Sequence, residues 1–184
     1  MMHELGKQYE KDNKFKASAR LHQSKYRADT LKVDYEEYGN RLTDRDAKNL
    51  LNYYDGLNVR TALRDRYPRY SRHRDADMLR SEHIPFNFFV PLKNNPLLAK
   101  RLIENAFGIA CSSIKEILIE YAPDPKEAYL DDRTSFDAFI TYLHPQHGLS
   151  GIGIEVKYTE GKYRIGKTEK EKVENHQSSY WKMT

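Results

Sequence analysis

Three side chains in the second half of the sequence have the types and spacing of a divalent-metal site. Asp137 lies inside the apolar run SFDAFITYL, and Glu155 and Lys157 are two residues apart in GIGIEVKYT. Aspartate is disfavoured in strands, and a buried carboxylate needs a partner or a metal ion. Two carboxylates brought together repel each other unless a cation lies between them. Such oxygen ligands suit Mg²⁺ or Mn²⁺, and we expect the backbone carbonyl of Val156 to add a further oxygen.

A cation held in this way could support hydrolysis of a phosphodiester. It would polarise a phosphoryl oxygen and lower the pKa of a bound water, and Lys157 would orient or deprotonate that water or stabilise the developing charge. The competing interpretation is a network of acids and lysine on a solvated sheet face, since an acid two residues before a lysine is common. The aspartate in an apolar strand and the Gly-rich start of GIGIEVKYT favour the metal site.

A pair of neighbouring strands must position these residues. Branched and aromatic residues predict three strands, over residues 114–121, 135–143 and 151–159, and HPQHG predicts a turn that makes the last two an antiparallel hairpin. Side chains alternate between faces along a strand. Gly153, Glu155 and Lys157 should therefore share one face, with open space beside the glycine. Ile152 and the alternate residues after it should face the core.

Helices are predicted before these strands. Apolar spacing indicates helix over residues 26–55, with Thr43 at a helix start, and a further helix from Pro96 to a stop at Gly108. Two prolines bracket IPFNFFVPL, which predicts a buried, extended connection over residues 84–92. We expect a flexible polar N-terminus over 1–25, a helical Arg-rich extension over 26–80, and a core over 81–184.

Charge is distributed unevenly along the 184 residues. Residues 1–80 carry 18 Lys and Arg against 13 Asp and Glu, residues 81–160 carry 7 against 11, and residues 161–184 carry 6 against 3. Basic flanks around an acidic centre fit a cation site whose surroundings attract a polyanion. The segment 60–80 is the richest in arginine, and its guanidinium groups could hold phosphates or form a solvated loop with local aspartates. The candidates for phosphate contacts there are Arg60, Arg64, Arg66, Arg69, Arg72 and Arg74.

Several other functions are disfavoured by the sequence. A single cysteine, Cys111, cannot form an internal disulfide, and it is expected to be buried. His144 and His147 fit a turn better than a zinc site, and there is no phosphate-binding loop of the G-x-x-x-x-G-K-[ST] type. The lack of a long apolar segment or of a signal-peptide pattern predicts a cytoplasmic protein with no membrane span.

The segments TSFDAFITY and GIGIEVKYTE resemble the second and third motifs of the PD-(D/E)XK nuclease superfamily. Asp137 matches the aspartate of the superfamily, Glu155 its (D/E) position and Lys157 its lysine. The wider run over residues 26–160 resembles a bacterial branch assigned to restriction endonucleases. The resemblance implies an α/β, restriction-endonuclease-like mixed sheet with flanking helices, a divalent metal cofactor, and DNA as the substrate.

The resemblance also implies roles for residues outside the hairpin. Glu104, on the helix before the first strand, corresponds to a position where related nucleases often carry an acid near the metal, and it is favoured over Glu120 at the end of that strand. Arg133, in the loop before Asp137, is a candidate phosphate donor. The superfamily core usually continues with a helix and a strand, but 27 residues follow Lys157 here. We therefore expect a truncated core, which a homodimer could complete. Two alternatives to a nuclease stay open: a non-catalytic DNA-binding or interaction module with this fold, and a structural α/β protein in which the E-V-K sequence is accidental.

Overall fold

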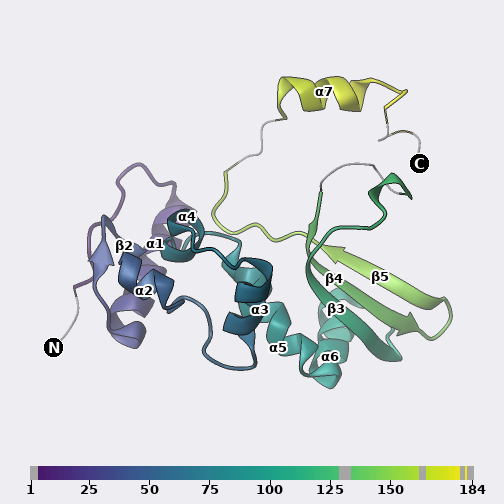
Figure 1. Ribbon diagram of the computed structural model, residues 1–184, viewed down its shortest axis with the longest axis horizontal. Coiled ribbons are helices and arrows are strands. Elements are labelled where there is room, and N and C mark those ends of the chain that lie inside the picture. The colour runs from purple at the N-terminus through teal and green to yellow at the C-terminus, as the bar shows by residue number, and fades with distance from the viewer. Residues whose placement is uncertain (1–3, 129–133, 162–164, 179–180, 182–184) are drawn as a thin grey trace.

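The computed structural model describes residues 4–128, 134–161, 165–178 and 181. Figure 1 shows a helical N-terminal half on one side and a three-stranded sheet on the other, with α3 and α5 between them. In chain order the elements are α1 (Lys14–Lys25), the π-helix η1 (Tyr26–Leu31), β1 (Tyr35–Glu36), β2 (Tyr38–Leu42), α2 (Asp44–Lys48), α3 (Val59–Arg66), α4 (Arg72–Ala76), the π-helix η2 (Pro85–Phe89), α5 (Val90–Lys93), α6 (Pro96–Phe107), β3 (Ser113–Tyr121), the 3-10 helix η3 (Lys126–Ala128), β4 (Phe136–His144), β5 (Gly148–Ile154) and α7 (Lys167–Glu174).

The predicted α/β class is confirmed, and its main sheet has the order β3-β4-β5. Both strand pairs are antiparallel, so the predicted hairpin of β4 and β5 is present, with the turn at residues 145–147 between them. The His144 ring nitrogen Nδ1 accepts hydrogen bonds from the backbone N–H groups of Gln146 and His147, at 3.1 and 3.2 Å. These two histidines therefore stabilise a turn, as expected.

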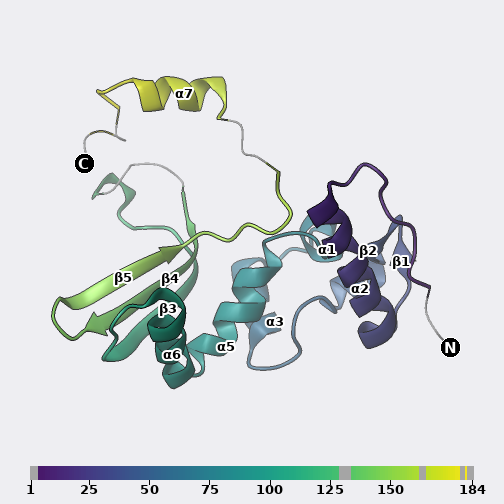
Figure 2. The same cartoon turned by 180° about the vertical axis from the view of Figure 1, so that it is seen from behind.

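One face of the sheet packs against α5 and α6 and forms the main core. Ile103 of α6, Ile117 of β3 and Ile140 of β4 are buried in it together with Cys111, which confirms the expected burial of the thiol. Figure 2 shows α6 alongside β3 from behind. Burial of apolar side chains stabilises a folded protein by about 25 cal/mol per Å² removed from water. The packing of α5 and α6 therefore holds the sheet in place.

The helix α6 begins and ends where its sequence predicts. The Asn95 side chain accepts a hydrogen bond from the backbone N–H of Leu98 at 3.1 Å, and Pro96 occupies the first turn. Gly108 ends the helix in the left-handed conformation, with φ of 65°. That conformation is strained for residues with a Cβ, which explains why the helix stops at glycine.

The segment IPFNFFVPL is helical, so the expected extended connection was wrong. It forms η2 and runs directly into α5. Phe86, Phe89 and Val90 are buried, at the three-to-four residue spacing of a helix face. Pro85 lies in the first turn of η2 and Pro91 in the first turn of α5, the helix positions that tolerate a missing N–H best.

The expected helix over residues 26–55 is interrupted by a hairpin. Helical structure is confined to η1 and α2, and β1 pairs with β2 between them. Gly39 in β2 allows the close approach of residue 5, because an added Cβ there would meet the Leu5 carbonyl oxygen at 2.0 Å. The predicted helix start at Thr43 is confirmed, since its hydroxyl accepts from the backbone N–H of Asp46 at 3.3 Å.

The N-terminal residues expected to be loosely held include an ordered helix. Arg20 of α1 is 7 % exposed, bonds to Asp12 at 2.5 Å and donates to the Asn40 side chain of β2. Arg27 is fully buried and donates to three backbone carbonyl oxygens, including that of Gly39. These buried, satisfied guanidinium groups fix α1 against the hairpin, which polar composition alone did not reveal.

The C-terminal helix α7 stands apart from the rest of the described chain (Figure 1). None of its eight residues is buried. Within the described ranges, no helix has both the length and the apolar character needed to cross a membrane.

Candidate active site

Asp137 lies on the central strand of the sheet, between two other acidic residues. The pairs Ile119↔Ala138 and Tyr121↔Phe136 place Glu120 of β3 opposite Asp137. On the other side Ala138 pairs with Ile154, so Glu155, one residue past the end of β5, comes opposite Asp137 as well. Directly opposed residues of antiparallel strands share a face of the sheet. The hairpin therefore brings Asp137 and Glu155 together, as the sequence predicted.

The carboxylate of Asp137 is held by the backbone of the neighbouring segment. The N–H of Val156 donates to its Oδ2 at 2.6 Å. Partial burial raises the pKa of Asp137, the Val156 hydrogen bond opposes the increase, and the negative charge of Glu155 adds to it. The negative charge of Glu155 beside the Asp137 carboxylate is an arrangement that a cation would stabilise.

Lys157 lies beside Glu155 and forms an ion pair with its Oε1. This hydrogen bond raises the pKa of Lys157, so the amine is charged at neutral pH. The side chains of Lys157 and Glu155 are 64 % and 54 % exposed, so an incoming polyanion could reach both. Ile152, Ile154 and Val156 instead pack against the core, which confirms the predicted alternation although β5 ends at Ile154.

The space expected beside the glycines of β5 is filled by aromatic rings. A Cβ on Gly153 would lie 2.5 Å from the Phe136 ring, and one on Gly151 would lie 2.7 Å from the Phe139 ring. The glycines thus allow these rings to lie close to the β5 backbone on the face that carries Asp137. The rings of Phe136 and Phe139 also contact each other, with centroids 5.6 Å apart. The prediction of open space beside Gly153 was therefore wrong.

Glu120 is the third acidic group at the site, although the sequence favoured Glu104 for that place. Its backbone has φ of 53°, an uncommon conformation for a residue with a side chain. Partial burial raises the pKa of Glu120, a hydrogen bond with Tyr67 opposes the shift, and Asp137 adds to it. Burial and Glu120 in turn raise the pKa of Tyr67 to about 12. The register between β3 and β4 places Glu120 beside Asp137.

The donor set at this site fits a divalent cation that retains water. Asp137 and Glu155 would supply carboxylate oxygens. Val156, whose carbonyl would supply a further oxygen, lies between Glu155 and Lys157 in the sequence. Over the described ranges, no three His, Cys, Asp or Glu side chains are grouped closely enough to enclose a metal ion. Mg²⁺ usually binds one or two carboxylates and completes its shell with waters and substrate phosphates, so an open two-carboxylate site suits it.

Glu104 lies elsewhere. It pairs with Lys100 one helical turn earlier on α6. It also lies close enough to Cys111 for its charge to act on the pKa of the thiol. Cys111 precedes the first residue of β3, whereas Glu120 and Asp137 lie at the other end of that strand. A strand rises about 3.3 Å per residue, so the length of β3 separates Glu104 from the carboxylate pair.

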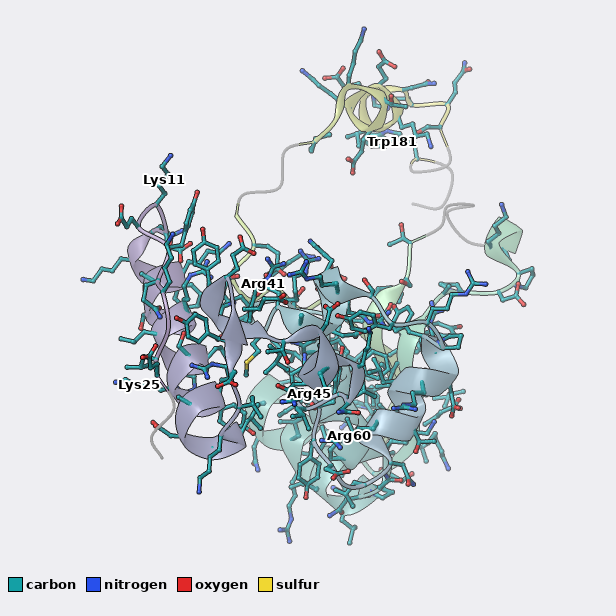
Figure 3. The ribbon with its side chains drawn as sticks, turned by 60° about the vertical axis from the view of Figure 1, so that its left-hand side comes forward. Lys11, Lys25, Arg41, Arg45, Arg60 and Trp181 are labelled. Carbon is teal, nitrogen blue, oxygen red and sulfur yellow. The ribbon has the colours of Figure 1, made fainter. Side chains whose placement is uncertain are left out.

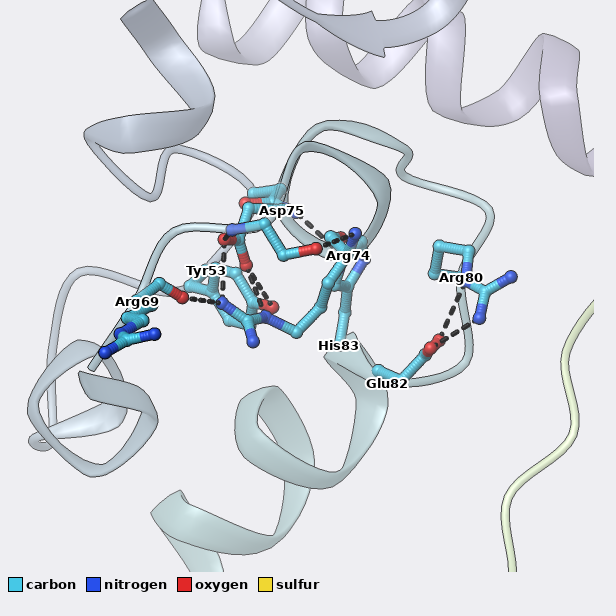
Figure 4. A network of polar contacts seen from close by, with 9 residues as sticks. Tyr53, Arg69, Arg74, Asp75, Arg80, Glu82 and His83 are labelled. Atoms are coloured by element: carbon cyan, nitrogen blue, oxygen red, sulfur yellow. Dashed lines mark hydrogen bonds and ion pairs between the residues drawn. The ribbon is translucent and has the colours of Figure 1, made fainter. Parts of the chain in front are cut away.

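The arginines of segment 60–80 divide into paired and unpaired groups. Arg74 bonds to the buried Asp75 at 2.7 Å and to the Arg69 carbonyl oxygen at 3.0 Å, within the network of Figure 4. Arg60 pairs with Asp55, and Arg72 with Glu36. These ion pairs compete with phosphate binding. Figure 3 shows Arg60 and Arg45 among the cations distributed over several elements of the N-terminal half.

Three arginines of the segment form no ion pair within the described part of the chain. Arg66 is exposed and lies near Glu120, where its charge partly opposes the rise in the Glu120 pKa that burial causes. Arg64 and Arg69 are exposed and form no ion pair with any residue that the structure describes. They line a cavity of about 310 Å³ together with Tyr67, which contacts Glu120. Arg133 lies outside the described residues.

Comparison with known proteins identifies the family. The sequence profile described as the PD-(D/E)XK nuclease superfamily matches residues 10–183, which include the hairpin, Asp137 and Glu155. Comparisons with curated proteins and with solved structures gave no match. Since the matched range covers nearly the whole chain, this protein belongs to the PD-(D/E)XK nuclease superfamily.

Proposed function

We propose that this protein is a divalent-metal-dependent endonuclease that hydrolyses phosphodiester bonds in DNA, with Asp137, Glu155 and Lys157 as its catalytic residues. The proposal extends to a role in restriction or defence. The observation that carries it is the opposition of Asp137 and Glu155 across the hairpin. Superfamily membership supports the nuclease class.

The carboxylates would hold the cofactor, Mg²⁺ or Mn²⁺. The residues for this are Asp137, Glu155 and the carbonyl of Val156, and the Val156 N–H orients the Asp137 carboxylate. When bound there, a divalent cation supplies polarisation of the scissile phosphate and a lowered pKa for water. Glu155 and Lys157 are exposed, so the substrate phosphate can approach from solvent.

Lys157 would supply the remaining charge. Its protonated amine lies next to Glu155, where it can orient the attacking water or stabilise negative charge on the phosphoryl oxygens. On the other side of Asp137, Glu120 is held by Tyr67 and lies near Arg66. Arg64 and Arg69, around the adjoining cavity, would hold neighbouring phosphates of the DNA backbone. The strand would then cross the sheet end from Lys157 towards these arginines.

The test is nicking of supercoiled plasmid in the presence of Mg²⁺ or Mn²⁺. Wild type should convert the plasmid to the nicked form, and Asp137→Ala and Lys157→Ala should not. Glu116→Ala is a matched control, because Glu116 lies on β3 but is exposed towards the opposite end of the sheet. Cutting that persists unchanged in both site variants would remove this assignment.

A non-catalytic DNA-binding module is the second candidate. It is favoured by the ion pair between Lys157 and Glu155, which already neutralises one of the two carboxylates that would bind the metal. This candidate predicts DNA binding that is steeply salt-dependent but no metal-dependent nicking. The nicking assay combined with a binding measurement therefore separates the two functions.

A further inference from the structure

A second cavity, of about 630 Å³, lies between the N-terminal helices and the segment that follows Lys157. Tyr26 of η1, Phe88 of η2 and Tyr158 contribute to its wall. Its volume lies within the roughly 300–1,000 Å³ of sites that bind small organic groups. The cavity is distinct from the arginine-lined cavity beside Tyr67, because the two have no lining residue in common.

The wall of this cavity offers flat aromatic surfaces that solvent can reach. Tyr54, Phe88 and Tyr26 are 57 %, 46 % and 44 % exposed. Large aromatic side chains left accessible around a cavity provide faces on which a planar ring can stack. The ligand class indicated by these surfaces is therefore planar and aromatic.

Polar groups occur between the rings. Asn52 lines the cavity, and its Oδ1 is buried and accepts no hydrogen bond within the described part of the chain. Its Nδ2 lies 3.0 Å from Nε2 of the buried His83. Arg80, paired with Glu82, adds a positive group to the same wall. Amide and guanidinium groups beside aromatic faces suit the edge and face of a nucleobase.

The cavity is attached to the proposed catalytic segment. Tyr158 follows Lys157 directly, and its hydroxyl accepts from Nε2 of Gln23 on α1 at 3.3 Å. The next residues are fixed against the other wall, because Thr159 donates to the Leu79 carbonyl oxygen and the Ser81 N–H donates to Glu160, both at 3.1 Å. In Figure 1 the chain after β5 crosses towards α4 in this way. The site and the cavity wall are thus consecutive in the chain.

We propose that this cavity receives an unpaired base of the DNA strand that is cut. The inference rests on the proposed nuclease function and adds a base-binding subsite to it. A base extruded next to the scissile phosphate would stack on the exposed ring of Tyr54 or Phe88. Extrusion costs least where the base is already unpaired, so the subsite favours single-stranded or distorted DNA over regular duplex.

The test is fluorescence anisotropy of a short labelled single strand, measured with EDTA so that no cutting occurs. A second strand has the same length and backbone but consists of abasic units. Tyr54→Ala and Phe88→Ala should each weaken binding of the normal strand roughly 5- to 150-fold, the range for removal of a base–aromatic stack. Both should leave binding of the abasic strand unchanged, because the groups that hold phosphate are retained.

The control is Phe107→Ala, which removes a ring of the same 46 % exposure as Phe88 from the end of α6, outside the cavity. Its binding to both strands should equal that of wild type. The base subsite is refuted if wild type binds the normal and abasic strands equally, or if both cavity variants bind like the control, whatever the nicking assay gives. Base-dependent binding without metal-dependent nicking would instead support the subsite and refute the nuclease proposal alone.

Discussion

Glu155 lies opposite Asp137 across the β4–β5 hairpin, and its negative charge adds to the effect of burial, which raises the pKa of that aspartate. Lys157, two residues further along, pairs with Glu155, and the backbone N–H of Val156 donates to Asp137. A divalent cation shared by the two carboxylates would offset their negative charge.

The amine of Lys157 should contribute to rate and not to metal affinity. We expect Lys157→Ala to lower the rate of metal-dependent nicking by about 10²–10⁴-fold, the range for removal of a proton-transfer or charge-stabilising group. The same variant should bind Mn²⁺ at least as tightly as wild type, because a positive charge beside the carboxylates has been removed. Single-turnover cleavage and Mn²⁺ titration on the same preparation would check both expectations. A variant that loses metal binding together with cleavage would contradict the role given to Lys157.

The exposed pair Arg64 and Arg69 should hold DNA phosphates. The double variant Arg64→Ala/Arg69→Ala should bind DNA more weakly and reduce the slope of log K against log salt by about 0.9 for each phosphate that is no longer neutralised. Binding isotherms at several salt concentrations measure this slope. Arg101→Ala is the control, because Arg101 is exposed on α6, outside the arginine-lined cavity. An unchanged slope in the double variant would show that these arginines do not touch phosphate.

Glu160 should make stability depend on acid pH. Burial alone would raise the pKa of Glu160, but hydrogen bonds from Ser81 and from the Tyr158 backbone outweigh it and lower the pKa to about 2. An acid with a depressed folded-state pKa stabilises the fold above its unfolded pKa of roughly 4.3, and that contribution disappears as pH falls towards about 2. Glu160→Gln should therefore lower Tm at pH 7. Because the group is largely exposed, we expect a cost on the order of 1 kcal/mol at most.

Thermal melts of wild type and Glu160→Gln across pH 2–7 would check this dependence. The difference in Tm should be greatest near neutrality and should shrink as the pH falls. A constant difference across the range would mean that the Glu160 charge does not hold the segment after Lys157 against Ser81.

Gly153 should be sensitive to a single added methyl group. Gly153→Ala forces the Phe136 ring to move, and overpacking of this kind typically costs about 1–3 kcal/mol. Gly161→Ala is the matched control, because nothing lies within 4 Å of an added Cβ there. Chemical denaturation of both variants should show a lower free energy of unfolding for Gly153→Ala alone. Equal stabilities would contradict the packing described between Phe136 and β5.

The sequence predicted the elements whose signals are local. The alternation in GIGIEVKYT, the turn at HPQHG and the stop at Gly108 each follow from side-chain period or backbone freedom, and each is present. The opposition of Asp137 and Glu155 was also predictable, because a short turn fixes the register of a hairpin.

The features that the sequence did not predict depend on contacts between distant residues. Arg20 and Asn40 are twenty residues apart, and their hydrogen bond fixes a helix in a segment that composition marked as loose. The position of Glu120 beside Asp137 depends on the β3–β4 register, which no short turn sets. The location of Glu104 at the far end of the sheet depends on the packing direction of α6.

Whether Asp137 and Glu155 share a metal ion can be measured by calorimetric titration of Mn²⁺ into wild type, Asp137→Asn and Glu155→Gln. We predict one ion bound by wild type and affinity at least about tenfold weaker in each variant, because each lacks one carboxylate of a two-carboxylate site, a change of about 1.4 kcal/mol or more. Glu116→Gln should bind like wild type. Equal Mn²⁺ affinity in all four proteins, or no binding by wild type, would contradict a shared ion between Asp137 and Glu155.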